Sequence, residues 1–249
     1  MLQSVQKALQ VFETVAKSEP IGVSEIARQL NISKSTAQRC LHTLHEAGWI
    51  KVDQKAGSTQ WRITSKAFGL GQRVSEHGQL REIAISVMGK LWEAIQESIH
   101  LVVAEGQKAI VIDQYESPTP FHMERPRLAW APLHTVASGK VMLAHFDTKL
   151  LDQYIAGGLD SFTKKTITDP KILRKELEKV RRQGWAVGID EIIVGGSHAA
   201  APIYGWDGRN IAALAFTMPT VRFSQSVRKK NIPLLVDAAA EISRRLKDA

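Results

Sequence analysis

The first third of the chain contains three stretches in which apolar side chains recur every three or four residues, a spacing that places them on one face of a helix. The three faces are Val5, Ala8, Leu9, Phe12 and Ala16; Val23, Ile26, Ala27 and Leu30; and Ala37, Cys40, Leu41 and Leu44. We expect Ser24 to cap the second helix and Ser33 the third, with Asn31-Ile32 as the turn between them. Three short helices with so tight a second connection predict a helix-turn-helix.

Two short runs of alternating apolar and polar residues follow the third helix. Trp49–Asp53 and Gln60–Ile63 flank a polar loop that contains Gly57, and this pattern predicts a β-hairpin. A hairpin directly after a helix-turn-helix makes a winged helix. The alternative is a hairpin that only covers the core and contacts nothing outside the domain.

The rest of the chain mixes the two periodicities. Strand patterns are His100–Ala104, Ala109–Tyr115, Trp185–Val187, Ala199–Ile203 and Ile211–Thr217, and helix patterns are Ile83–Glu97, Ser138–Ala144, Asp147–Ile155, Asp169–Gln183 and Ser224–Leu246. A helix is also expected from Ser65 to Glu76, closed by His77-Gly78, with a new helix near Leu80. Because the order lacks strict βαβ alternation, the sequence predicts an α+β fold with a largely antiparallel sheet.

The composition is that of a globular protein, with 249 residues of which 44% are hydrophobic and 23% charged. No run of eighteen apolar residues and no signal-peptide pattern is present, so we expect a cytoplasmic protein without membrane contact. Cys40 is the single cysteine, which excludes an intramolecular disulfide. The net charge of +8 is uneven: residues 1–81 hold eleven Lys and Arg against six Asp and Glu, a local +5. A basic small domain suits a partner that is a polyanion.

The polar face of the third helix carries hydrogen-bond donors and acceptors that suit a nucleic acid. The alternative is that this face is the solvated side of an ordinary core helix. We expect phosphate contacts from the start of the helix, at Ser33, Lys34, Ser35 and Thr36, and contacts to base edges from Gln38, Arg39 and His42. The tip of the wing would reach phosphates or the minor groove with Lys55, Gly57 and Ser58.

Motifs for catalysis, nucleotides and metals are lacking. HTVASGKV has His134 and Val141 where a Walker loop needs Gly and Ser or Thr, which excludes nucleotide hydrolysis, although Val136–Gly139 would suit a carboxylate or be an ordinary helix start. His100, His122, His134, His145 and His198 stand singly, so no metal and no cofactor is expected. Ser197-His198 are strand neighbours that point to opposite faces, and Asp190-Glu191 is typical of a solvated turn. No catalytic residue is therefore predicted.

Several motifs in a fixed order resemble the IclR family of bacterial transcription regulators over nearly the whole chain. They are ALQVFETVA, VSEIARQLNISKSTAQRCLHTLHEAGWI, REIAISVMGKLWEAI, APLHTVASGKVMLA, ITDPKILRKELEKVRRQGWAVGIDE and AAEISRRL. The resemblance implies a winged helix-turn-helix at 1–64, a linker helix at 65–79 and a GAF-like effector-binding domain at 80–249. It also implies a homodimer or homotetramer that binds double-stranded DNA and a small organic acid.

The resemblance also implies an acid site in the C-terminal domain. The acid's carboxylate would meet the backbone of Ala137 and Ser138. The family's side-chain contacts to the acid, carried over by register, fall on Gly188, His198, Ala215 and Thr217. The family pattern has Asp, Cys, Ser and Ser at the last four positions, so only Thr217 keeps a hydroxyl. Glyoxylate or pyruvate is therefore not favoured, and apolar side chains in the preceding loop, Met123, Trp130 and Leu133, favour a larger or more apolar acid.

Three further residues near this site have two interpretations each. Arg125 and Arg127 would clamp a carboxylate or be solvated loop residues, and His134 would donate to a ligand or be a satisfied core residue. The function predicted from the sequence is a ligand-responsive transcription regulator and not an enzyme. The alternatives are an enzyme that acts on a small carboxylate with an accessory winged helix, and a winged helix that binds protein instead of DNA.

Overall fold

The computed structural model describes residues 2–53, 59–71, 75–119 and 130–248. Contacts divide the chain into two compact units, Met1–Gly78 and Gln79–Ala249, and each is described by itself. None of the described helices has the length and hydropathy needed to cross a membrane.

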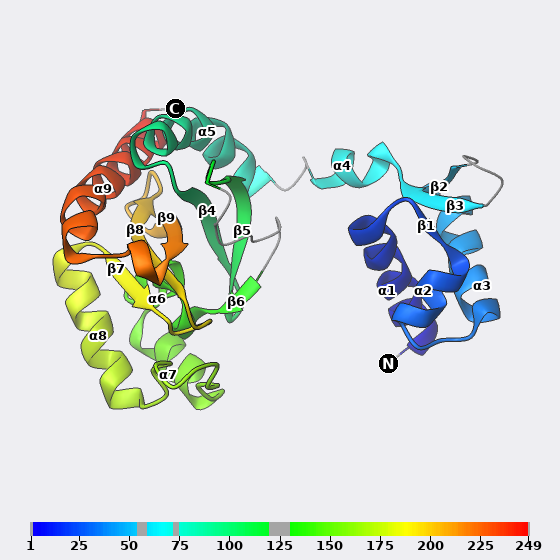
Figure 1. Cartoon of the computed structure of the whole chain (residues 1–249), viewed down its shortest axis with the longest axis horizontal. Helices are drawn as coiled ribbons and strands as arrows, with labels where there is room; N and C mark the ends of the chain where they lie inside the picture. Colours follow the sequence, from blue (N-terminus) through cyan, green and yellow to red (C-terminus); the bar gives the residue numbers. More distant parts are fainter. Residues whose placement is uncertain (1, 54–58, 72–74, 120–129, 249) are drawn as a thin grey trace. The chain divides into compact units, whose positions relative to one another are not determined.

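The first unit is a winged helix (Figure 1). Its elements are α1 (Gln3–Ser18), β1 (Ile21–Gly22), α2 (Val23–Gln29), α3 (Lys34–Glu46), β2 (Ile50–Asp53), β3 (Gln60–Ile63) and α4 (Ser65–Gly71). The described strands pair antiparallel in the order β1-β3-β2, with Val52 opposite Trp61. The three helices and the hairpin enclose a core that includes Val15, Ile26, Leu41 and Trp61, as the hydrophobic pattern predicts for α2 and α3.

Two expectations for this unit are wrong. The buried face of α1 is Val11, Thr14 and Val15, whereas Val5 and Leu9 are 53% and 56% exposed. Both sets have helical spacing, so the pattern alone does not decide which face packs against α3. Ser24 is not a cap either, because α2 already begins at Val23 and Gly22 precedes it.

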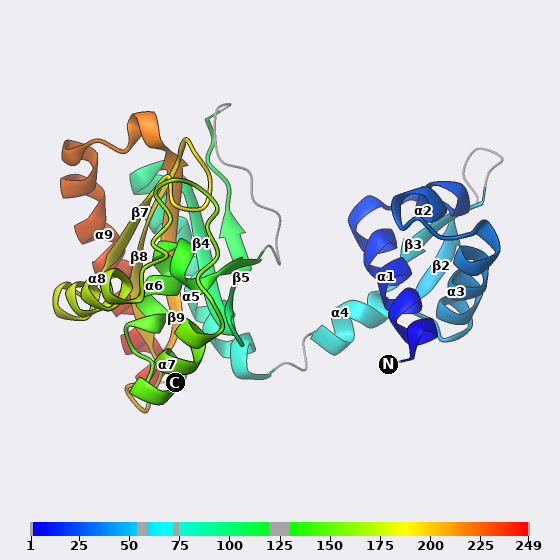
Figure 2. The ribbon, with the colours of Figure 1, turned by 90° about the horizontal axis from the view of Figure 1, so that it is seen from below.

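The second unit is an α+β domain (Figures 1 and 2). Its helices are α5 (Ser75–Ile95, beginning in the first unit), the short η2 (Leu133–Thr135), α6 (Ala137–Leu143), α7 (Thr148–Ala156), α8 (Pro170–Gln183), η3 (Thr220–Arg222) and α9 (Gln225–Lys247). Its strands are β4 (Ser98–Glu105), β5 (Lys108–Tyr115), β6 (Trp130–Pro132), β7 (Ala186–Ile189), β8 (Gly196–Tyr204) and β9 (Asn210–Pro219). Over the described residues these six strands form one antiparallel sheet in the order β6-β5-β4-β9-β8-β7, which confirms the predicted fold class.

Side-chain alternation along the strands gives this sheet two apolar faces. Leu101, Leu214 and Phe216 point to the face covered by α5 and α9, whereas Val102 and Ala213 point to the face covered by α6 and α8. Successive residues of a strand project to opposite sides, so a strand between two helical layers is apolar throughout. The second face is the one that matters for the candidate site.

The predicted helix break at His77-Gly78 is absent, because both residues lie within α5. A glycine inside a helix costs only about 1 kcal/mol relative to alanine, which the packing of Leu80, Ala84 and Met88 against the sheet offsets. The short strand β6 was also not predicted; it forms from the end of the loop through pairing with β5, as in Ala109 opposite Ala131.

Candidate functional site

The first turn of α3 is held by the predicted cap. The hydroxyl oxygen of Ser33 accepts a hydrogen bond from the backbone N–H of Thr36 at 3.1 Å. The same oxygen lies 3.0 Å from the Ser35 hydroxyl and 2.8 Å from the Thr36 hydroxyl. Ser33, Lys34 and Ser35 are exposed, so hydroxyl groups, a cation and free backbone amides gather at the outer end of this helix.

The remaining polar side chains of α3 lie along its outer face. Gln38 and His42 are one turn apart, and their Nε2 atoms are 3.0 Å from each other. Arg39 is exposed and has no acidic partner in the part of the chain that the structure describes. Buried Ala37, Leu41 and Leu44 fix the opposite face, so this side is presented to solvent rather than to the core. Lys55, Gly57 and Ser58 of the wing tip lie outside the described residues.

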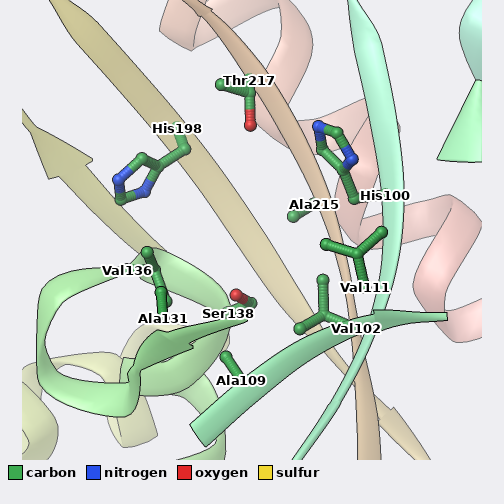
Figure 3. Close-up of a pocket in the computed structure, with 10 residues that line it drawn as sticks. All are labelled: His100, Val102, Ala109, Val111, Ala131, Val136, Ser138, His198, Ala215 and Thr217. Atoms are coloured by element: carbon green, nitrogen blue, oxygen red, sulfur yellow. The ribbon is translucent and has the colours of Figure 1, made fainter. Parts of the chain in front are cut away.

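A small cavity of about 30 Å³ lies in the second unit, between the sheet and α6 (Figure 3). Apolar side chains from β4, β5 and β9 line one part of it, and His100, His198 and Thr217 line the other. Antiparallel pairing brings these three together, because His198 is opposite Thr217 and His100 is opposite Ala215. We call it the effector cavity; it is lined by His100, Val102, Ala109, Val111, Ala131, Val136, Ser138, His198, Ala215 and Thr217.

The structure brings most of the described candidate acid-site residues together. Ser138, His198, Ala215 and Thr217 line the effector cavity. The backbone N–H of Ala137 donates a hydrogen bond to Nδ1 of His198 at 3.0 Å. Gly188 is opposite His198 in the pairing of β7 with β8, and the imidazole lies directly over it.

Three other candidates lie elsewhere. Leu133 is fully buried in the core, and Trp130 is 57% exposed with the Lys108 ammonium 3.9 Å from its ring centre. His134 is a satisfied core residue: Nδ1 is 2.7 Å from the Tyr154 hydroxyl, and Nε2 is 3.0 Å from the Asp160 carbonyl. A carbonyl only accepts, so Nε2 carries the proton. Met123, Arg125 and Arg127 lie outside the described residues.

Burial governs the titration of that histidine and its partner. Desolvation lowers the pKa of the His134 imidazole, although the hydrogen bond to Asp160 acts in the opposite direction. Desolvation likewise raises the pKa of the Tyr154 hydroxyl. Both groups are therefore neutral near pH 7, which suits a structural role.

The sequence did not single out His100 or the apolar lining residues. They alternate correctly along predicted strands, but alternation gives two faces and does not say which one meets α6. The register of β4 against β5 also shifts between Leu101 and Val102, so the partner of each residue cannot be obtained by counting along the two strands. Strand pairing would have been needed to find them.

Helix α6 also carries one end of a buried ion pair. Lys140 is 1% exposed, and its Nζ donates to Glu191 Oε1 at 2.6 Å and to the Val187 carbonyl at 3.0 Å. Burial raises the pKa of the Glu191 carboxyl, and the Lys140 charge opposes that shift. Glu191 is thus not the residue of a solvated turn. Gly139 lets the start of α6 pack closely against the backbone of Leu133, since a Cβ at residue 139 would lie 2.1 Å from the Leu133 carbonyl oxygen.

The chemistry of the cavity is that of a binding site. Its walls are mainly apolar, with an imidazole pair and two hydroxyl groups to orient a ligand. The described residues contain no group of three or more His, Cys, Asp or Glu side chains that could hold a metal ion.

Comparison with family models covers almost the whole chain. Residues 72–244 match the model described as bacterial transcriptional regulator IclR C-terminal, and residues 4–54 match the IclR helix-turn-helix domain. A curated relative, the HTH-type transcriptional regulator KdgR of Escherichia coli K12, is 30% identical over 97% of this chain and 92% of its own length.

Solved structures agree with these matches. The crystal structure of the Thermotoga maritima IclR superposes with a TM-score of 0.82 at 27% identity, over 99% of this chain and 100% of the other. An IclR homologue from Microbacterium hydrocarbonoxydans, solved in complex with 4-hydroxybenzoate, also gives a TM-score of 0.82 over 99% and 100%, and its 22% identity speaks for the fold alone.

Proposed function

Because the chain belongs to the IclR family of bacterial transcriptional regulators, we propose that it binds a roughly palindromic DNA operator as a dimer or tetramer, under the control of a small organic acid. The observation that carries the proposal is the outer face of α3. Its cap, its exposed Lys34 and Arg39 and the Gln38–His42 pair supply the donors and acceptors that phosphates and base edges require.

The proposed arrangement on DNA follows from the helix-turn-helix. One α3 from each of two protomers would enter successive major grooves, so the half-sites would lie about one helical turn apart. The start of the helix, from Ser33 to Thr36, would contact phosphates. Gln38, Arg39 and His42 would read bases.

The effector cavity would bind the acid. The apolar part, with Val102, Val111 and Ala215, suits a hydrocarbon or aromatic body, while Ser138 and Thr217 suit its polar groups. The acid would act by binding two states of the regulator with different affinity.

Selection from random DNA tests the proposal with the full-length protein. We expect enrichment of a palindromic sequence and an affinity that falls steeply with salt, as phosphate contacts require. A panel of mono- and dicarboxylic acids is then added to the complex. One class of acid should change the affinity for the selected site and raise the melting temperature of the protein.

The two alternatives predict other results. A winged helix that binds protein would give no sequence enrichment and no steep salt dependence. An enzyme would convert an acid of the panel, which chromatography of the incubated mixture would detect. Either result would overturn the proposal.

A further inference from the structure

The effector cavity is smaller than most small-molecule sites. Its volume of about 30 Å³ would accommodate roughly two water molecules, whereas small-molecule sites usually span about 300–1,000 Å³. An acid larger than this free space therefore enters only if a side chain leaves the cavity. The geometry points to one residue.

The imidazole of His198 lies in the wall of the cavity, between the sheet and α6. It starts from β8, and its Nδ1 accepts the hydrogen bond from the Ala137 N–H of α6 at 3.0 Å. Since Nδ1 accepts, the neutral ring carries its proton on Nε2. The ring thus joins β8 to the start of α6, and Figure 3 shows it among the residues that line the cavity.

Gly188 makes room for this position of the ring. A Cβ on residue 188 would lie 2.0 Å from Cε1 of His198, closer than any real contact. The backbone of Gly188 has no left-handed conformation that would itself require glycine. Residue 188 must therefore be glycine to leave room for the His198 ring, and the position of the ring depends on the absence of a Cβ at residue 188.

We propose that His198 is a gate: its imidazole fills the acid-binding part of the effector cavity, and an acid binds only when the ring leaves the Ala137 amide. This inference rests on the proposed function. Rotation about the side-chain bonds is enough to move the ring while β8 stays paired. The gate sets the acid concentration at which the regulator responds, because only the open fraction of molecules is competent to bind.

The gate also selects the chemistry of the ligand. Opening leaves the buried Ala137 N–H without its acceptor, and an unsatisfied buried donor is costly. A carboxylate oxygen replaces the lost acceptor, whereas an apolar molecule of the same shape does not. An amide oxygen is a weaker, uncharged acceptor, so the open site favours the acid over its amide.

Calorimetry on full-length variants tests the gate. Pyruvate, benzoate and 4-hydroxybenzoate are screened by thermal shift, and the acid that most stabilises His198→Ala is titrated into each protein. We expect His198→Ala to bind it about tenfold more tightly than the unmodified protein, because no intramolecular hydrogen bond has to be broken. Benzamide serves as the neutral match for benzoate and should gain less.

Two further variants separate the gate from a general loss of packing. Gly188→Ala keeps the histidine but drives its ring away, so it should also bind the acid more tightly. In the His198→Ala background the same alanine should change neither affinity nor melting temperature. The control is His145→Ala, which removes a half-buried imidazole that contacts Tyr204 and Val141 and not the cavity; its affinity for the acid should be unchanged.

Nitrogen NMR of the imidazole gives a readout that does not depend on folding of a variant. In the unmodified protein, saturating acid should shift the Nδ1 resonance of His198 and leave that of His145 in place. The gate is overturned if an acid binds the unmodified protein and His198→Ala equally, or if the variant binds it more weakly; the proposed function stands in either case. If no acid stabilises either protein, the gate and the effector part of the proposed function both fail.

Discussion

The outer face of α3 and the effector cavity are built in opposite ways. The helix presents its polar residues within a single stretch, from Ser33 to His42, and most of them are exposed. The cavity is assembled from strands between His100 and Thr217, with α6 closing it, and its polar groups are buried. Substitutions on an exposed helix face have independent effects, whereas a substitution in a cavity that several strands share also alters the packing of its neighbours.

The largest expected effect lies in the buried region. Lys140→Met leaves the Glu191 carboxylate buried without its partner and should lower the free energy of unfolding of the second unit by about 3–5 kcal/mol. Urea unfolding measures the loss. Because burial raises the pKa of Glu191, the deficit should shrink at acid pH, where the carboxyl becomes neutral.

The matched control is Lys140→Met combined with Glu191→Leu. It replaces both charges with apolar groups and should recover most of the stability. If the double variant is as unstable as the single one, the loss comes from packing around α6 and not from the unpaired charge.

The next effect belongs to the exposed face. Arg39→Ala should weaken binding to the selected operator by about 1–3 kcal/mol and leave binding to random DNA nearly unchanged, if the guanidinium reads a base. Lys34→Ala is the comparison: it should weaken both equally and reduce the salt slope by about one. Fluorescence anisotropy at several salt concentrations distinguishes them. An equal loss on both DNAs for Arg39→Ala would assign it to phosphate.

A smaller effect is expected from the cap of α3. Ser33→Ala removes the acceptor of the Thr36 N–H and should lower the stability of the first unit by about 1 kcal/mol. Thermal unfolding without DNA isolates this effect from binding. Ser35→Ala, whose hydroxyl is exposed, should stay within about 0.5 kcal/mol of the unmodified protein. Equal losses would show that the cap bond contributes nothing of its own.

The smallest effect concerns pH. Burial holds the pKa of His134 below 6.5, so the unfolded chain takes up a proton near pH 6.5 that the folded protein does not bind. The stability that His134 contributes is therefore present above pH 6.5 and is lost as the pH falls towards the lower pKa of the folded state. His134→Gln should flatten this part of the stability profile in urea titrations between pH 7.5 and 5. A profile parallel to that of the unmodified protein would contradict the assignment.

The same contrast explains how far the sequence could be interpreted. Strands and helices of the second unit lie close to their predicted ranges because each has its own periodicity and caps, such as Asp169 before α8. The cap at Ser33 and the buried face of α3 were predicted for the same reason. Errors arose where two faces had equal spacing, as in α1, where Val11 and Val15 are buried instead of Val5 and Leu9.

The lining of the cavity was predicted only in part. Family resemblance placed Ser138, His198, Ala215 and Thr217 together, and they do share a cavity. It did not indicate His100, the hydrogen bond from Ala137 to His198, or the burial of Glu191 against Lys140. All three depend on contacts between residues that are far apart in the chain, such as Lys140 and Glu191.

The sequence by itself determined most of the elements, the winged helix and the residues on the outer face of α3, because periodicity and capping act over a few neighbouring residues. Only the tertiary structure decided which strand faces meet α6, why residue 188 is glycine, and that two imidazoles line the cavity. Strand register and close packing between distant segments leave no local pattern in the chain.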